Sequence, residues 1–375
     1  MILQLKKQYW TYYLWSFGFI LVFFIAEILN HRFWLNDFKV YYLSSIDFLE
    51  GKSIYENTYG LGSGWFKYSP FFAMLFSIFT LISYKVASLV FYWIIGVCIL
   101  VFLPLIGEKS KGERHLMWVL PIVFLFIADH LVRELHLGNV NMILLSLSFL
   151  LFALYQKGNS WLGSFVFALI IVLKPYFMLL GLFFLLKKEW KWIGVTAFFT
   201  LVFLLLPALL VGFTENMDLL KGWGRAMSNH NAEITSYNYL SGSIEKYFSV
   251  HISIFVFIGL FVLTYLGLFF KKILKDDYLS FFLLIAIIPN LVLTDTEHFL
   301  YSIPLLIYFF KNIEVKLELI TVMGLIGCVL YGLNWGFFWG SKTGDVVTSG
   351  IIGIGNLLLI VSVLMMASKQ QQISK

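Results

Sequence analysis

Charged residues are scarce in this chain. Of its 375 residues only 13% are Asp, Glu, Lys or Arg, whereas 60% are hydrophobic and 19% are aromatic, and the mean hydropathy is +0.85. Soluble domains carry about a quarter charged residues, and the polar stretches here are no longer than loops. This composition excludes a soluble enzyme. It predicts an all-α polytopic membrane protein that forms one integral membrane domain over residues 1–375.

Cysteine is scarce too, and potential metal ligands are scattered. Cys98 and Cys328 lie inside apolar segments, where a thiol behaves as a small hydrophobic group. They provide neither a disulfide framework nor a metal site. His130 and His136 lack the spacing of zinc ligands, and the carboxylates are isolated. The sequence therefore predicts no cofactor, and it leaves dependence on a divalent metal ion open.

The excess of positive charge is small, with 27 basic and 21 acidic residues and a net charge of +6. In a membrane protein such an excess belongs to the cytoplasmic loops, so it does not indicate nucleic-acid binding. The first apolar run follows Lys6 and Lys7, is too long for a signal-peptide core and has no small-residue cleavage site. We expect it to remain as an uncleaved first span.

Apolar segments recur from Trp10 to Ala367. Because one helical span takes about 20 apolar residues, we expect about 12 transmembrane helices, within a range of about 11 to 13. Lysine clusters at 187–191 and 271–275 are typical of cytoplasmic loops. The same rule places both termini in the cytoplasm of an inner-membrane protein.

This topology predicts two large extracytoplasmic loops, at residues 31–67 and 213–251. Cytoplasmic placement of residues 109–115 then requires an odd number of crossings after the first of these loops. Two apolar segments lie there, at 69–83 and 86–106. One of them is therefore expected to be re-entrant or interfacial.

The first outside loop contains DFKVYYLSSIDFLEGKSIY, which has the spacing of an amphipathic helix. Charged residues lie elsewhere on the helical wheel, so we expect an interfacial helix along the membrane surface. We expect the helix to end at Gly51. The apolar positions are Phe38, Tyr41, Tyr42, Ile46 and Leu49.

Asp37, at the start of this helix, has two interpretations. An aspartate just before a helix is a favoured N-cap, because its carboxylate accepts hydrogen bonds from the first backbone amides. Alternatively, it is a general base at the membrane surface that deprotonates an acceptor hydroxyl. The two roles compete for the same oxygen atoms.

Lys67 and Tyr68 lie where this loop re-enters the membrane. Lys67 is either an interfacial anchor beside aromatic residues or a cation that binds a lipid phosphate. The nearby glycines would let the backbone approach such a phosphate closely. These glycines are Gly60, Gly62 and Gly64.

The stretch DHLVRELHLGNVN, residues 129–141, places charges between two apolar segments. Charged groups at this depth are costly unless they are paired or face a cavity. Arg133 therefore either forms a structural ion pair with Asp129 or Glu134, or contacts a ligand.

Lys174, in LKPYF, lies between two short apolar stretches. In a hairpin it would reach the outer face. In a single kinked span over residues 161–186, which is also long enough to cross, it would be buried and would need a partner.

Two later outside segments carry polar residues. Arg225, His230 and Asn238 in loop 213–251 either form a solvated loop or bind a hydroxyl-rich ligand. In DTEHF, His298 follows Glu297 and could tune or share a proton with Asp37. Alternatively, Asp295 or Thr296 simply caps the next helix.

Several of these motifs together resemble glycosyltransferase family 87. The resemblance depends on the order of DFKVYY, YSPFF, GNVNMILLSL, LGSFVFALIIVLKPYFMLL and TEHFLYSIPLL, and it covers about residues 36–310. The family commonly has Gln at the position of Asn139, so here one amide replaces another. Members belong to the GT-C superfamily of polytopic enzymes that use polyprenyl-phosphate sugars.

The resemblance implies an inverting transferase with a GT-C fold and an extracytoplasmic active site. Its donor would be a polyprenyl-phosphate sugar, best characterised in the family for mannose, and its acceptor a hydroxyl of a lipid or glycan. Asp37 would be the catalytic base and His298 its partner. The candidates for donor phosphate binding are Lys67, Arg133 and Lys174, and those for substrate binding are Tyr41, Tyr68, Asn139, Asn141, Arg225, His230, Asn238 and Glu297.

The chemistry of glycosyl transfer is compatible with this assignment, independently of the resemblance. A sugar on a polyprenyl phosphate already has a good leaving group, so the enzyme needs a base and cations more than a strong acid. A transporter or flippase for a lipid or glycan is the alternative if the charges line a path through the midplane. An O-antigen polymerase or ligase of different fold is a further alternative, although such enzymes centre on several arginines in a late loop and loop 213–251 has only Arg225.

Overall fold

The computed structural model describes residues 9–61, 64–109, 116–229, 237–293, 295–313, 318–335 and 339–373. Helices dominate these residues, and the strands among them form one two-stranded hairpin. The prediction of an all-α protein is confirmed. The chain divides into two compact units, each built from separate stretches of sequence.

Membrane-spanning character is concentrated in a few long helices. Among the described residues, four helices are long and apolar enough to cross a membrane, namely Trp10–Leu29, Tyr84–Lys109, Trp190–Val211 and Ile351–Gln372. A fifth candidate is the pair Met117–Leu137 and Asn141–Gln156, which is bent by 112° at the break between the two helices. Six further apolar helices have 10–17 residues. The protein is polytopic, and the number of about 12 crossings stays a prediction.

The segment Pro70–Leu81 is one of the shorter apolar helices, whereas Tyr84–Lys109 is long enough to span. A crossing takes about 20 residues. Of the two segments between the first outside loop and residue 109, the first is therefore the one that we expect not to cross.

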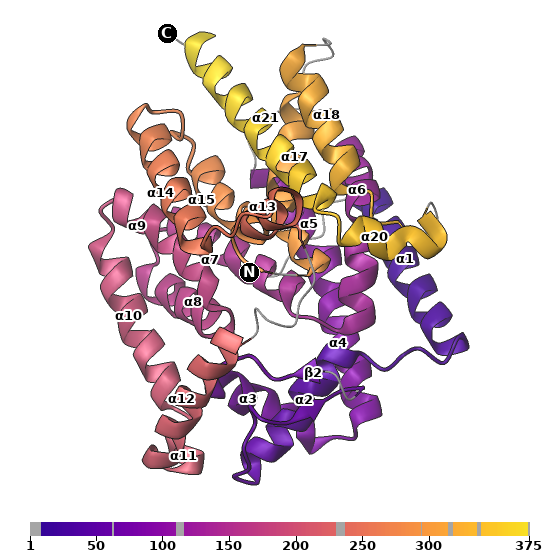
Figure 1. Ribbon diagram of the computed structural model, residues 1–375, viewed down its shortest axis with the longest axis vertical. Coiled ribbons are helices and arrows are strands. Elements are labelled where there is room, and N and C mark those ends of the chain that lie inside the picture. Colours follow the sequence, from indigo (N-terminus) through magenta and orange to yellow (C-terminus); the bar gives the residue numbers. More distant parts are fainter. Residues whose placement is uncertain are drawn as a thin grey trace. The chain divides into compact units, whose positions relative to one another are not determined.

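Unit 1 comprises Met1–Trp15, Leu103–Arg133 and Ile234–Lys375. Gly324 and Gly327 let α18 approach its neighbours closely, because a Cβ at Gly324 would lie 2.2 Å from the Phe309 ring of α17 and one at Gly327 would lie 2.8 Å from Leu359 N of α21. Small residues at such contacts are typical of membrane helices, and Figure 1 shows α18 beside α21. Its helices are α5 (Leu103–Lys109), α6 (Leu116–Leu137) as far as Arg133, α13 (Leu240–Phe248), α14 (Ile254–Phe270), α15 (Asp277–Ala286), α16 (Ile288–Leu291), η6 (Thr296–Ser302), α17 (Ile303–Asn312), α18 (Leu319–Tyr331), η7 (Gly340–Lys342), α20 (Thr343–Val347) and α21 (Ile351–Ile373).

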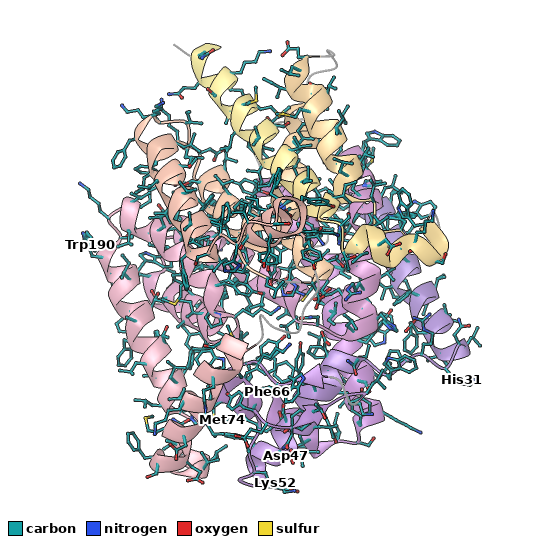
Figure 2. The ribbon with its side chains drawn as sticks, viewed as in Figure 1. His31, Asp47, Lys52, Phe66, Met74 and Trp190 are labelled. Carbon is teal, nitrogen blue, oxygen red and sulfur yellow. The ribbon has the colours of Figure 1, made fainter. Side chains whose placement is uncertain are left out.

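Unit 2 comprises Ser16–Phe102 and Glu134–Glu233. In it α8 packs between α7 and α10, and Trp190 at the start of α10 points outward (Figure 2) and is 65% exposed. Its elements are α1 (Trp10–Leu29) from Ser16 onward, α2 (Asn36–Leu49), β1 (Thr58–Tyr59), β2 (Gly64–Trp65), α3 (Pro70–Phe76), η2 (Ser77–Leu81), α4 (Tyr84–Val97), η3 (Cys98–Phe102), α7 (Asn141–Gln156), α8 (Ser160–Leu173), η4 (Pro175–Leu180), α9 (Gly181–Leu186), α10 (Trp190–Leu205), α11 (Ala208–Val211) and α12 (Phe213–Asn229).

The chain reverses direction at Lys174. Phe184 of α9 lies with its ring centroid 5.4 Å from that of Phe167 in α8 and 5.1 Å from that of Trp192 in α10. The Ser164 hydroxyl of α8 donates to the Trp192 carbonyl (3.0 Å). Residues after Lys174 therefore return alongside α8, so the structure has the hairpin and not the single kinked span. Lys174 lies at its tip.

The predicted amphipathic helix is α2. It ends before Gly51, whose φ of +70° is the left-handed conformation expected of a C-terminal glycine. Phe38 and Tyr41 are buried, whereas Leu49 is 52% exposed. The helix is confirmed, and its position along a membrane surface stays a prediction.

Candidate active site

Asp37 is the second residue of α2 and is partly buried. The N-cap position belongs to Leu35, which makes no side-chain capping bond. Instead, Oδ2 of Asp37 accepts a hydrogen bond from Nδ2 of Asn139 (2.7 Å). Of the two interpretations of Asp37, N-capping is therefore wrong for this structure. The carboxylate is oriented by a side-chain amide.

Asn139 reaches Asp37 because the corner between α6 and α7 packs closely on α2. Gly138 has φ +67°, and a Cβ there would lie 3.0 Å from Leu35 Cβ and 3.1 Å from Phe38 Cβ. Oδ1 of Asn139 accepts from Val140 N (2.7 Å), which turns its Nδ2 toward Asp37. A glycine is needed here both for the left-handed backbone and for the close approach.

Two tyrosines continue this cluster. The hydroxyls of Tyr41 and Tyr68 are 2.8 Å apart, and the Tyr41 hydroxyl lies 3.5 Å from Oδ1 of Asn139. Burial raises the pKa of both phenols well above their ordinary value, and the negative charge of Asp37 raises it further. Both tyrosines are therefore neutral and act as hydrogen-bonding groups, not as bases.

A second polar group surrounds Lys174, whose side chain is only 6% exposed. Nζ of Lys174 donates to Oδ1 of Asn141 (2.7 Å), and Nδ2 of Asn141 donates to Glu134 (2.9 Å). Glu134 is fully buried and also accepts from Met142 N (2.8 Å). An amide thus bridges a buried ammonium and a buried carboxylate, which lowers the cost of burying either charge.

The Lys174 group and the Asp37 cluster meet at Tyr68. Nζ of Lys174 lies 6.0 Å from the Tyr68 ring centroid and 5.9 Å from that of Tyr176. Asn139 and Asn141 are separated by one residue at the start of α7, and they hold Asp37 and Lys174 respectively. Unit 2 therefore brings together an oriented carboxylate, a fixed positive charge and two phenols.

Lys67 precedes Tyr68 and is partly buried, and its carbonyl accepts from Nε1 of Trp223 in α12 (3.2 Å). The neighbouring glycines pack the β1–β2 hairpin on α2. A Cβ at Gly60 would lie 2.4 Å from Oδ1 of Asn36, and one at Gly64 would lie 2.5 Å from Val40. These two glycines are thus required for packing, and Gly62 lies outside the described residues.

Unit 1 holds another charged group. Nε of Arg133 donates to Glu297 (2.8 Å), and its Nη2 lies 3.6 Å from Asp295. Arg133 is thus paired with Glu297 and Asp295, whereas the carboxylate of Glu134 accepts from Asn141 and Met142 N. Arg133 keeps 40% of its side chain exposed. The arginine can therefore still contact a ligand.

His298 lies beside this ion pair in unit 1 and is only 9% exposed. Its Nδ1 lies 3.2 Å from the Asp295 carbonyl and 3.8 Å from Glu297 Oε1. Asp295 is the N-cap residue of η6, without a side-chain capping bond. Asp37 belongs to the other unit, so a partnership between His298 and Asp37 stays a prediction.

The remaining candidates are separated. Arg225 is exposed on α12 in unit 2. Asn238, in unit 1, donates to the Val347 carbonyl (2.7 Å) and accepts from Gly353 N (3.2 Å), so it joins backbone segments. His230 lies outside the described residues. Within the described part of the chain, no group of three or more His, Cys, Asp or Glu side chains could hold a metal ion.

The sequence profile of glycosyltransferase family 87 matches residues 65–294, which is more than half of the chain. The chain belongs to glycosyltransferase family 87. This match includes Lys67, Asn139, Lys174 and the α6–α7 corner, and the resemblance noted from the motifs is confirmed.

One curated relative of this family 87 protein is the alpha-(1->3)-arabinofuranosyltransferase of Corynebacterium glutamicum. It is 26% identical over 176 residues, which cover 44% of this chain and 41% of the relative. The chain thus matches less than half the length of this relative. No solved structure matches the chain at a significant level. The chain is thus a member of a glycosyltransferase family and has helices long and apolar enough to cross a membrane.

Sequence reasoning missed several residues that build the candidate site of this family 87 protein. Glu134 was considered only as a partner for Arg133, yet it organises the start of α7. Tyr55 and Trp223 hold the Lys67–Tyr68 backbone through hydrogen bonds to its carbonyls. The available signal for Glu134 was a charged residue four positions before the glycine of the turn, Gly138. Tyr55 and Trp223 gave none.

Proposed function

We propose that the protein is an inverting glycosyltransferase that uses a polyprenyl-phosphate sugar as donor. The acceptor is a hydroxyl of a lipid or glycan, and the reaction takes place at the extracytoplasmic face of the inner membrane. The observation that carries this proposal is the pairing of Asp37 with Asn139, beside a buried Lys174. One oriented carboxylate with a fixed positive charge nearby is what this chemistry requires.

Asp37 is the general base in this mechanism. Its carboxylate removes the proton of the acceptor hydroxyl as the oxygen attacks the anomeric carbon of the sugar. The bond between that carbon and the phosphate oxygen breaks, and polyprenyl phosphate leaves with the electron pair. A single carboxylate acting as base, without a second one as nucleophile, inverts the anomeric configuration.

The cations stabilise the leaving phosphate. Lys174 is a fixed charge whose position is set by Asn141, and Lys67 lies next to Tyr68 at the same cluster. Positive groups that are already in place stabilise the charge that develops on the phosphate without further reorganisation. Arg133 is a third candidate for the phosphate, and His298 is the proposed partner of the base.

The sugar has two candidates. The motifs resemble family members that transfer mannose, whereas the curated relative is named an arabinofuranosyltransferase. Both transfers need the same base and the same phosphate contacts. Tyr68 is partly exposed, and its ring and hydroxyl are proposed to contact either sugar.

A lipid or glycan flippase would need charges along a path through the midplane. In unit 2 the polar groups of Asn141 and Lys174 instead meet at one end of the α7–α8 pair. This arrangement favours a site at one face over a transport path.

Transfer can be tested directly with purified protein in lipid nanodiscs. Radiolabelled polyprenyl-phosphate mannose and polyprenyl-phosphate arabinofuranose would be supplied separately, with membrane extracts as acceptor. We expect product from one donor and none with Asp37→Asn, which preserves size and removes the charge. Turnover by Asp37→Asn at the rate of the unaltered protein would remove Asp37 from the mechanism, and no product from either donor would refute the proposal.

A further inference from the structure

A cavity lined in part by charged side chains lies in unit 2, between the loop that follows α2 and the helices α11 and α12. Its volume is about 210 Å³. Lys52, labelled in Figure 2 near Asp47 at the end of α2, lies on one wall. Its charged lining residues are Lys52, Glu56, Glu215, Asp218 and Arg225, and its aromatic lining residues are Phe48 and Tyr55.

The charges that line this cavity have both signs. Three carboxylates oppose two cations, which disfavours a phosphate or another anion. The two cations likewise disfavour the binding of a metal ion. A lipid tail in the cavity would remove water from the charged groups, which is energetically costly. A neutral molecule with many hydroxyl groups fits, because carboxylates accept from hydroxyls and guanidinium donates to them.

The walls of the cavity are attached to the candidate active site. Tyr55 lines the cavity, and its hydroxyl donates to the Tyr68 carbonyl (2.8 Å). Gly222, which also lines the cavity, packs directly on Tyr55, because a Cβ there would lie 2.8 Å from Tyr55 Cδ2. The next residue, Trp223, donates to the Lys67 carbonyl (3.2 Å). One tyrosine side chain therefore separates the cavity from the Lys67–Tyr68 segment.

We infer that this cavity binds a neutral sugar residue of the acceptor, one or more positions away from the sugar whose hydroxyl reacts at Asp37. The inference rests on the proposed function. The acceptor is then an oligosaccharide chain, because a single sugar bound at Asp37 would not reach into the cavity. The cavity then selects acceptors by length and holds the reacting hydroxyl in place.

Binding can be measured without turnover. Cys98 and Cys328 are both buried, so Ser53→Cys on the exposed rim of the cavity would give a reactive thiol for maleimide labelling. Arg32→Cys, exposed in the same unit outside the cavity, is the control. The probes are a neutral mannose trisaccharide, a neutral arabinofuranose trisaccharide and polyprenyl phosphate.

We expect one of the trisaccharides to slow labelling at Ser53→Cys, by about tenfold when its concentration is about ten times its Kd, and to leave Arg32→Cys unaffected. Protection by polyprenyl phosphate without protection by either sugar would overturn the inference, because it would make the cavity an anion site. Equal labelling with every probe would overturn it as well.

Kinetics provide a second test once a donor is known. Glu215→Gln and Arg225→Gln should raise the KM for a trisaccharide acceptor about tenfold relative to the KM for a single-sugar acceptor, as expected for the loss of one hydrogen bond to a charged group. Arg32→Gln is the matched control and should change neither constant. Equal changes for both acceptors would overturn the inference. A protein that transfers no sugar at all would refute the proposed function, while the labelling experiment would still decide what the cavity binds.

Discussion

At the scale of single residues, the site depends on which groups hold the functional side chains. Asp37 receives the Asn139 amide at 2.7 Å, and the oxygen of that amide is fixed by Val140 N. We therefore propose a positioning role for Asn139, and its contact with substrate stays a prediction. An oriented base needs less rearrangement in the transition state.

This role gives a prediction for two variants of Asn139. Asn139→Ala should lower kcat about 100-fold, because a displaced reacting group costs about that much. Asn139→Asp would place a second carboxyl beside Asp37 and raise the pKa of one of the two. Because the base acts only when ionised, the rising limb of the pH–rate profile should move to higher pH.

The measurement is the dependence of kcat on pH for both variants and for Asn57→Ala, an exposed amide of the same loop. Asn57→Ala should behave like the unaltered protein. An unchanged rising limb in Asn139→Asp would contradict the assigned role.

Lys67 provides a prediction about the donor. Lys67→Ala should weaken donor binding by about 1.5 to 3 kcal/mol, as expected when a charge-assisted contact with phosphate is lost. Lys85→Ala, exposed on α4, is the matched control. Donor affinity measured by equilibrium binding decides between the two interpretations, and an unchanged value for Lys67→Ala would make Lys67 an interfacial anchor.

The sequence was informative about which residues take part but not about how they pair. The motifs named Asp37, Asn139, Asn141 and Lys174, and the structure brings these four together. The pairings join residues as far as 102 positions apart, and no local pattern encodes which amide faces which charge. The same limit applies to Arg133. The sequence suggested Asp129 or Glu134 as its ion-pair partner, whereas the structure pairs it with Glu297, which lies 164 positions away.

At the scale of elements, the corner between α6 and α7 positions the site. Two features form it: Glu134 accepts from Asn141 and Met142 N, and Gly138 turns the backbone with φ +67°. A carboxylate at the start of α7 also interacts favourably with the positive end of that helix. The corner therefore links backbone geometry to the placement of both asparagines.

A pair of glycine variants tests this corner. Gly138→Ala should destabilise the protein more than Gly158→Ala, because both glycines have nearly the same positive φ but only Gly138 is crowded. The left-handed backbone costs about 1 to 2 kcal/mol in each variant, and the clash with Leu35 and Phe38 adds about 1 to 3 kcal/mol at Gly138 alone.

Thermal unfolding in detergent measures this difference, and transfer activity should fall only in Gly138→Ala. Equal destabilisation of the two variants would show that α2 does not press on the corner.

Elements with a strong local signal were predictable. Helical spacing identified α2, and Gly51 marked its end, because both depend on neighbouring residues. The reversal at Lys174 was one of two alternatives, since the Lys-Pro step breaks a helix in either case and only the packing of α9 against α8 and α10 decides the direction. The hairpin of β1 and β2 was not expected, because its two-residue strands are too short to give an alternating pattern.

At the scale of the whole molecule, composition was sufficient to predict a polytopic membrane protein but not its division into two compact units. An apolar chain with few charges has to be polytopic, and the structure has helices that can span a membrane. Each of the two compact units combines segments that are separated along the chain. Such units leave no linker and no change in composition, so the sequence indicated a single domain.

Orientation in the membrane is the last prediction, and it follows from the distribution of lysines. The positive-inside rule places Lys271 and its neighbours in the cytoplasm and the loop after α2 outside. Because both natural cysteines are buried, single cysteines report sidedness without background. Glu50→Cys and Lys271→Cys, both at exposed positions, would be treated in intact cells with a maleimide that cannot cross the membrane. In intact cells we expect labelling of Glu50→Cys alone, and after permeabilisation we expect labelling of both variants. Labelling of Lys271→Cys alone in intact cells would place Asp37 on the cytoplasmic side and exclude an extracytoplasmic reaction.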